Sequence, residues 1–224
     1  MFLTLARKLV HSWRAKRIEA MHGQPQWRKV PAGFWMYIDP KEWFGKTVLM
    51  GYYESHLVYL IHQVCRRGDV GVDIGANQGY FALHMARKVG VEGCVVAIEP
   101  IEPTYARLVE NIRRNRAPQV HCVPRAAGAC VQSLEMWYDP AESMYSSVHN
   151  CPSEQAKRIT VQVEPVDAIL EQLLTPQQLD KLVFAKIDAD IHSERFNAEL
   201  DDIVAVVPHS TGWERLMRSR IHIR

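Results

Sequence analysis

The sequence predicts an α/β protein with a doubly wound, mostly parallel sheet. Short apolar, β-branched runs recur along the chain, segments with helical spacing of apolar residues alternate with them, and a glycine-rich turn joins one such run to the next helix. The chain has 224 residues, of which 47% are hydrophobic and 23% charged. This length and composition suit one globular domain with an N-terminal extension.

The first part of the chain, residues 1–52, differs in pattern from residues 53–224, and we treat it as an N-terminal extension. Residues 1–22 combine five basic side chains and one acid with apolar residues at helical spacing, which predicts a basic amphipathic helix. Such a helix could lie on an anionic membrane surface, but we expect it to pack against its own domain. Six aromatic residues and three prolines in 23–51 predict a cap of short strands and turns rather than helix.

From residue 54 to residue 123, helical and strand patterns alternate, and glycine or proline marks several of their ends. The strand segments are continuous apolar runs of the kind that is buried on both faces of a parallel sheet. In order, we expect a helix over 54–67 stopped by Gly68, a strand over 70–74, a helix over 80–89 closed by Gly90, a strand over 94–98, a helix opened by Pro103, and a strand over 120–123.

The rest of the chain contains two segments in which apolar and polar residues alternate, 134–138 and 159–163, with a polar loop between them. This pattern predicts an antiparallel hairpin inserted into the domain. A short helix near 166–174, a buried strand over 181–187 and a further strand over 203–207 follow.

The turn after the strand over 70–74 carries glycines with a physical role. Gly75 allows the backbone to turn sharply, and Gly79 allows the next helix to start close to the strand. Dinucleotide enzymes have G-x-G-x-x-G, in which the middle glycine lets a pyrophosphate approach bare backbone. Here the spacing is G-x-x-x-G, Asn77 stands at the middle position, and Asp73 precedes the first glycine by two residues.

This pattern suits S-adenosylmethionine, which has no phosphate. Asp73 can accept a hydrogen bond from the cofactor's ammonium, while N–H groups of the turn face its carboxylate. Glu99 lies 20 residues after Gly79, a spacing that suits a carboxylate that accepts hydrogen bonds from both ribose hydroxyls. This spacing fits S-adenosylmethionine and a dinucleotide equally well. Each piece alone also occurs in ordinary turns and caps, but their order predicts a nucleoside-cofactor site.

The segments VGVDIGANQGYFALHMA, VVAIEP and AKIDAD resemble FkbM-type S-adenosylmethionine-dependent methyltransferases, over roughly residues 68–190. The resemblance implies a Rossmann-like sheet of the class I methyltransferase type, the cofactor S-adenosyl-L-methionine, and methylation of a hydroxyl on a sugar or natural-product acceptor. The cofactor-binding positions that we assign from these motifs are Asp73, Gly75, Ala76, Asn77, Gly79, Tyr80, Glu99 and Pro100.

The chain departs from the family pattern after the strand over 181–187. Members usually continue as K-I-D-x-E/D-G-x-E, whereas here Ile191 and Ser193 replace the glycine and the final glutamate. Only 34 residues follow Asp190, and we therefore expect a methyltransferase domain that is incomplete at its C-terminus. Asp188 and Asp190 are the candidate catalytic residues, because either could position the acceptor hydroxyl or remove its proton.

Three other functions stay open from the sequence. The chain could be a non-catalytic cofactor-binding remnant of the family, or an NAD(P)-dependent oxidoreductase that uses the same α/β site. The third function is glycosyl transfer: Asp188 and Asp190 form the D-x-D pattern with which many glycosyltransferases hold a divalent cation, and His192 adds a possible metal ligand. We expect no metal site, because this reading would leave the glycine turn without a role.

The charge and cysteine pattern bears on partners and compartment. A formal charge of +2 is far from the basic excess of a dedicated nucleic-acid binder, so we expect a small-molecule or glycan acceptor and no nucleic acid. The five cysteines are spread without a C-x-x-C pair, and no N-x-S/T acceptor occurs. No signal peptide and no membrane-spanning run is evident, and we expect a soluble, cytoplasmic protein.

Overall fold

The structure, a computed structural model, describes residues 12, 23–140, 151, 153–187 and 203–206. The chain divides into two compact units, Met1–Leu57 and Val58–Arg224. Their boundary lies within helix α3, Ser55–Val64. The sequence placed the division a few residues earlier, between residues 52 and 53, and the division into these two domains stays a prediction. The amphipathic helix expected in residues 1–22 lies outside the described residues.

The first unit contains an antiparallel strand pair, β1 (Gln26–Lys29) with β2 (Trp35–Ile38), followed by helix α2 (Trp43–Met50). The expectation of strands and turns without helix is therefore wrong for its last part. The three prolines all precede α2, so none removes an N–H from its hydrogen-bond ladder. The aromatic residue Phe44, which favoured a strand, instead packs edge-on against Tyr53, with ring centroids 5.0 Å apart.

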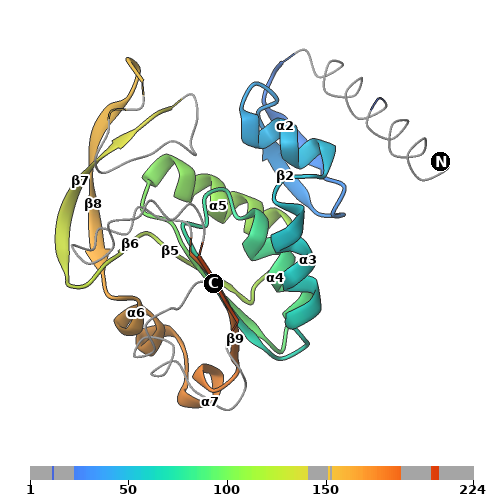
Figure 1. Ribbon diagram of the computed structural model, residues 1–224, viewed down its shortest axis with the longest axis vertical. Coiled ribbons are helices and arrows are strands. Elements are labelled where there is room, and N and C mark those ends of the chain that lie inside the picture. Colours follow the sequence, from blue (N-terminus) through green and yellow to red (C-terminus); the bar gives the residue numbers. More distant parts are fainter. Residues whose placement is uncertain (1–11, 13–22, 141–150, 152, 188–202, 207–224) are drawn as a thin grey trace. The chain divides into compact units, whose positions relative to one another are not determined.

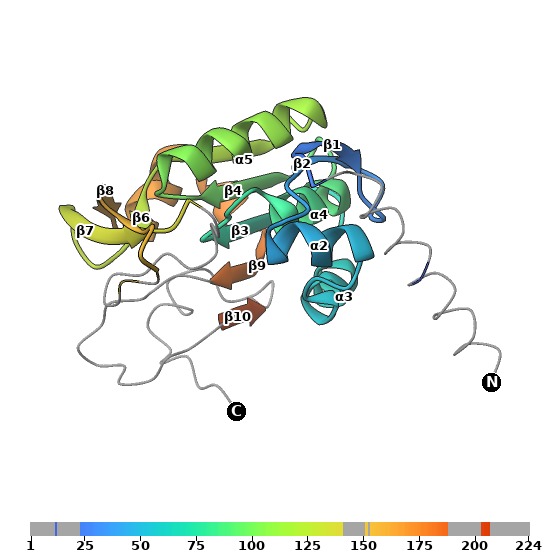
Figure 2. The ribbon, with the colours of Figure 1, turned by 90° about the horizontal axis from the view of Figure 1, so that it is seen from above.

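The second unit is built on a five-stranded sheet in the order β10-β9-β3-β4-β5. Strands β3, β4, β5 and β9 are parallel, and β10 is antiparallel to β9. The opposed arrows of β9 and β10 are visible in Figure 2. The doubly wound, mostly parallel sheet predicted from the sequence is thus confirmed. The strands are β3 (Val70–Ile74), β4 (Cys94–Ile98), β5 (Val120–Val123), β9 (Leu182–Ile187) and β10 (Ile203–Val206).

Helices cover both faces of this sheet (Figure 1). On one face α4 (Tyr80–Val89) lies so close that a Cβ added at Gly71 would come within 2.7 Å of the Met85 sulfur. On the other face α6 (Val166–Leu173) packs into the apolar cluster formed by β3, β4 and β9. The unit also contains α5 (Glu102–Arg114) and α7 (Pro176–Leu179). Among the described residues, no helix has the length and hydropathy needed to cross a bilayer.

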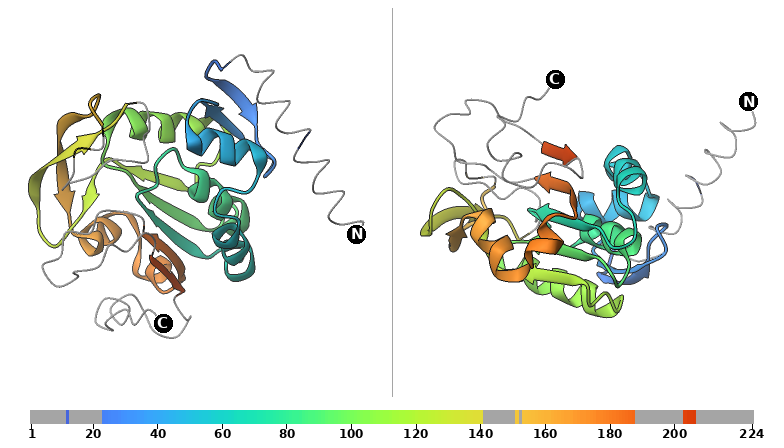
Figure 3. Two further views of the ribbon diagram at one scale, coloured as in Figure 1. Left: turned by 45° about the horizontal axis from the view of Figure 1, so that its top comes forward. Right: turned by 90° about the horizontal axis from the view of Figure 1, so that it is seen from below.

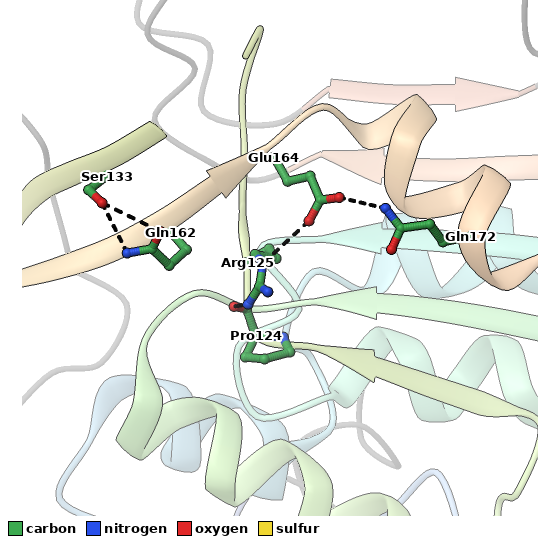
Figure 4. A network of polar contacts seen from close by, with 6 residues as sticks. All are labelled: Pro124, Arg125, Ser133, Gln162, Glu164 and Gln172. Atoms are coloured by element: carbon green, nitrogen blue, oxygen red, sulfur yellow. Dashed lines mark hydrogen bonds and ion pairs between the residues drawn. The ribbon is translucent and has the colours of Figure 1, made fainter. Parts of the chain in front are cut away.

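The predicted antiparallel hairpin is present as β7 (Gln132–Tyr138) and β8 (Lys157–Glu164). It belongs to a separate three-stranded sheet, because the two-residue strand β6 (Ala126–Ala127) pairs in parallel with β8 (Figure 3). The Glu164 carboxylate anchors the end of β8 to the parallel sheet (Figure 4). It lies 3.3 Å from Arg125 Nε, just after β5, and accepts a 2.8 Å hydrogen bond from Gln172 of α6.

Candidate functional site

The turn between β3 and α4 has the backbone conformation that its sequence predicts. Gly75 and Gly79 have φ values of 71° and 86°, in the left-handed region where a side chain is strained. Asn77 lies in the same region, with a φ of 47°, and asparagine is among the residues that tolerate it best. A Cβ at Gly79 would come within 2.5 Å of Leu108 of α5, so this glycine makes room for that helix. The sequence did not reveal this contact.

The N–H groups of this turn donate within the protein. Those of Gly75 and Ala76 both donate to the Ile98 carbonyl oxygen, at 2.9 Å each, and that of Gly79 donates to Ala76 O at 2.8 Å. The Asn77 N–H donates to Glu99 Oε2 at 2.9 Å. The N–H groups of Gly75, Ala76 and Asn77 therefore hold the turn against the end of β4, and that of Gly79 closes the turn itself. All four donate within the protein, and not to a cofactor carboxylate as the sequence suggested.

Glu99 follows β4 and joins three segments of the site. Its side chain is only 5% exposed, and its Oε1 accepts a 3.0 Å hydrogen bond from the Ile101 N–H, while Oε2 accepts from Asn77. A carboxylate oxygen has two lone pairs, and each Glu99 oxygen uses one of them here, so both oxygens retain the capacity to accept a hydrogen bond from a ligand hydroxyl. Burial raises the pKa of Glu99 to about 7, with the two backbone hydrogen bonds opposing the shift.

Asp73 lies within β3, is 0% exposed, and is the register neighbour of Ala97 in β4 and Lys186 in β9. Neighbouring residues in a parallel sheet point to the same face, and Glu99, two residues after Ala97, shares that face. Two buried carboxylates and one buried ammonium thus gather near the carboxyl ends of three adjacent strands. The sequence analysis missed Lys186, although a lone lysine in the apolar run LVFAKI was a visible signal.

A second residue that the sequence analysis missed is Asn111 of α5. It is fully buried, and its side-chain amide donates a 2.8 Å hydrogen bond to the Gln78 carbonyl oxygen. This bond ties the centre of the glycine turn to α5. The position of Asn111 between Leu108 and Ile112, on the apolar side of that helix, could have revealed it, because buried amides need hydrogen-bond partners.

The other predicted site residues are placed as follows. Tyr80, the first residue of α4, is 6% exposed and its ring packs edge-on against that of His84, with centroids 4.7 Å apart. Pro100 is half-buried beside Glu99. Asp188 and Asp190 lie outside the described residues. Within the described ranges, no group of three or more histidine, cysteine, aspartate or glutamate residues is arranged to hold a metal ion.

The raised pKa of Glu99 predicts a pH-dependent stability. The folded protein holds the Glu99 proton up to about pH 7, whereas the unfolded chain releases it near 4.5. The folded state therefore binds more protons in this window, and stability falls as pH rises from 4.5 to 7, by about 3 kcal/mol if Glu99 acts alone. Urea unfolding at a series of pH values should show the fall in the wild type but not in Glu99→Gln. A constant difference between the two proteins would contradict the raised pKa.

A family model described as "Methyltransferase FkbM domain" matches residues 73–190, more than half of the chain. The match begins at Asp73 and contains the glycine turn, Glu99, Lys186 and Asp188. No curated protein matches the sequence.

Solved structures show partial similarity. A SAM-dependent O-methyltransferase from Thermotoga maritima is 26% identical over 32% of this chain, with a TM-score of 0.29. Fibrillarin from Aeropyrum pernix with natively bound S-adenosyl-L-methionine is 18% identical over 32%, with a TM-score of 0.27. A protein-L-isoaspartate O-methyltransferase is 30% identical over 31%, with a TM-score of 0.29. The chain covers 27%, 32% and 22% of these three proteins, respectively.

Proposed function

Because the chain belongs to the family of FkbM methyltransferase domains, we propose that it transfers a methyl group from S-adenosylmethionine to a hydroxyl of a sugar or natural-product acceptor. The observation that carries this proposal is the arrangement of Asp73 and Glu99 around the glycine turn. Both carboxylates are buried beside a turn at the carboxyl edge of parallel strands, the edge at which open α/β sheets bind ligands.

The residues present fit this cofactor by charge and by hydrogen bonding. S-adenosylmethionine carries a sulfonium and an ammonium against a single carboxylate, so a site with two carboxylates and one lysine complements it. Each Glu99 oxygen has one protein donor and room for another, which suits a pair of ribose hydroxyls. Asp73 would face the ammonium, because it lies on the neighbouring strand at the base of the turn.

The same geometry disfavours a dinucleotide. A pyrophosphate needs unengaged N–H groups at the turn, and here the N–H groups of Gly75, Ala76, Asn77 and Gly79 all have acceptors within the protein. Two buried carboxylates nearby would also repel its charge. These contacts support a methyltransferase over an NAD(P)-dependent oxidoreductase.

When bound, the cofactor would supply an electrophilic methyl group, which the acceptor oxygen would take by in-line displacement of S-adenosylhomocysteine. The protein must then align that oxygen and accept its proton. We assign this step to Asp188, which directly follows β9 in the sequence, with Asp190, two residues further on, as the second candidate. Glu99 and Asp73 hold the cofactor in place.

Calorimetric titration with S-adenosylhomocysteine, S-adenosylmethionine and NAD tests the cofactor assignment. We expect the first two to bind and to raise the melting temperature, and NAD to do neither.

Glu99→Ala should weaken binding of S-adenosylhomocysteine about 10- to 150-fold, equivalent to about 1.5–3 kcal/mol. Glu92→Ala is the matched control, because Glu92 is an exposed glutamate paired with Arg67 at the surface. Binding of NAD alone, or equal affinities for wild type and Glu99→Ala, would contradict the assignment.

A further inference from the structure

Lys186 is an unusual residue for the interior of a parallel sheet. It stands in β9 among apolar neighbours and is 2% exposed. Most lysines that bury their aliphatic stem still extend the ammonium into solvent, but the ammonium of Lys186 does not reach it. Lysine is almost never fully buried unless its charge is compensated. The ammonium therefore needs anionic or polarisable groups around it.

Such groups surround it on the face of the sheet that α4 covers. Lys186 Nζ lies 5.1 Å from the centroid of the Phe81 ring, within range of a cation–π interaction. Asp73, its register neighbour, lies on the adjacent strand β3 and points to the same face. The strands β9, β3 and β4 lie side by side (Figure 2), so Glu99, which directly follows β4, is one strand further along than Asp73.

Without a cation, Asp73 and Glu99 could not both stay ionised at low cost. Two carboxylates that share a buried site raise the pKa of at least one of them. Glu99 experiences both effects, since Asp73 raises its pKa and Lys186 lowers it. Among the described residues, these are the two charged groups that act on Glu99. The remaining contacts are the N–H groups of Asn77 and Ile101.

We propose that Lys186 is a positioning residue of the cofactor site, whose buried ammonium offsets the charge of the neighbouring Asp73 carboxylate and favours the ionised form of Glu99, which receives a cationic cofactor. Its role toward the cofactor rests on the proposed function, while its effect on the two carboxylates is a property of the protein alone. Lys186 does not touch the reacting atoms in this role. It acts through Asp73 and Glu99.

The first test uses the full chain without cofactor. In protein labelled with ¹³C-glutamate, the Glu99 carboxyl signal, assigned with Glu99→Gln, should titrate with a midpoint near 7. Lys186→Met replaces the ammonium by an apolar side chain of similar length, and should move this midpoint to higher pH. Lys186→Arg keeps the charge and should leave the midpoint near the wild-type value. An unchanged midpoint in Lys186→Met would overturn the proposal.

A second measurement on the wild type needs no substitution at Lys186. At about pH 7.5, the ¹⁵N signal of the Lys186 side chain should be that of a protonated ammonium, because this pH is well below the ordinary lysine pKa of about 10.4. A neutral amine at this pH would overturn the proposal even if the variants fail to fold.

The third test measures the affinity for S-adenosylhomocysteine from about pH 6 to 9, a range that spans the Glu99 titration. The affinity of the wild type should fall as Glu99 takes up its proton, and in Lys186→Met this fall should begin at a higher pH. An equal loss of affinity at every pH would indicate a structural role and overturn the proposal. If the wild type binds neither S-adenosylhomocysteine nor S-adenosylmethionine, the proposed function fails, and the Glu99 titration still decides the effect of Lys186.

Discussion

Gly79→Val is expected to destabilise the second unit by about 2–6 kcal/mol and to abolish cofactor binding. A β-branched residue at a φ of 86° costs about 1–3 kcal/mol in backbone strain. Its Cβ would also come within 2.5 Å of Leu108, which is fully buried and cannot move into solvent, and such overpacking costs about a further 1–3 kcal/mol. Urea unfolding and calorimetric titration with S-adenosylhomocysteine measure the two effects.

Gly68→Val is the matched control for this substitution. Gly68 has nearly the same φ, 84°, but a Cβ there meets no atom within 4 Å. The control should therefore show the strain alone, about 1–3 kcal/mol, with cofactor affinity close to wild type. The difference between the two variants isolates the packing of the glycine turn against α5. Equal losses of stability would show that Leu108 moves aside at no cost.

Asp188→Asn is expected to lower turnover by about 10²- to 10⁴-fold, the usual contribution of a general base. Affinity for S-adenosylhomocysteine should change by no more than a few-fold, because a base acts in the transition state rather than on cofactor binding. The measurement is methyl transfer from labelled S-adenosylmethionine, after a panel of sugars and glycosylated scaffolds has identified an acceptor. Asp190→Asn, two residues further on, shows whether the effect belongs to Asp188 alone.

The two readouts separate the possible roles of Asp188. A loss of affinity as large as the loss of turnover would make it a cofactor ligand instead of a base. If wild type binds cofactor but methylates no acceptor, restoring glycine at 191 and glutamate at 193 provides the next comparison. Activity that appears only in that variant would identify the chain as a cofactor-binding remnant, contrary to the proposed function.

The site was predictable in its main-chain outline and less so in its contacts. The order of Asp73, the glycine turn and Glu99 along the chain predicted that they meet at one edge of the sheet, and Asn77 N–H indeed donates to Glu99. The sequence also suggested that the turn presents its N–H groups to a cofactor. Two of them instead share the carbonyl oxygen of Ile98, because β4 lies beside β3 at the register that brings Ile98 opposite Ile74.

One helix shows where local patterns mislead. The aromatic residues and prolines of 23–51 favoured short strands and turns without helix, and β1 and β2 do form there. Yet α2 occupies Trp43–Met50 and ends at Gly51, whose φ of 74° suits a helix C-terminus. Trp43 and Phe44 of this helix pack edge-on against Tyr53, and such packing outweighs intrinsic strand propensity.

The sequence by itself determined the alternation of strands and helices from β3 to β5, the left-handed glycines of the turn, and the family. These properties depend on hydrophobic periodicity and backbone sterics over a few residues, which a sequence displays directly. Only the tertiary structure decided that Lys186 lies beside Asp73, that Asn111 holds Gln78, and that Gly79 makes room for Leu108. Each of these joins residues on different elements, so burial and charge compensation depend on strand register and helix packing, which no local pattern encodes.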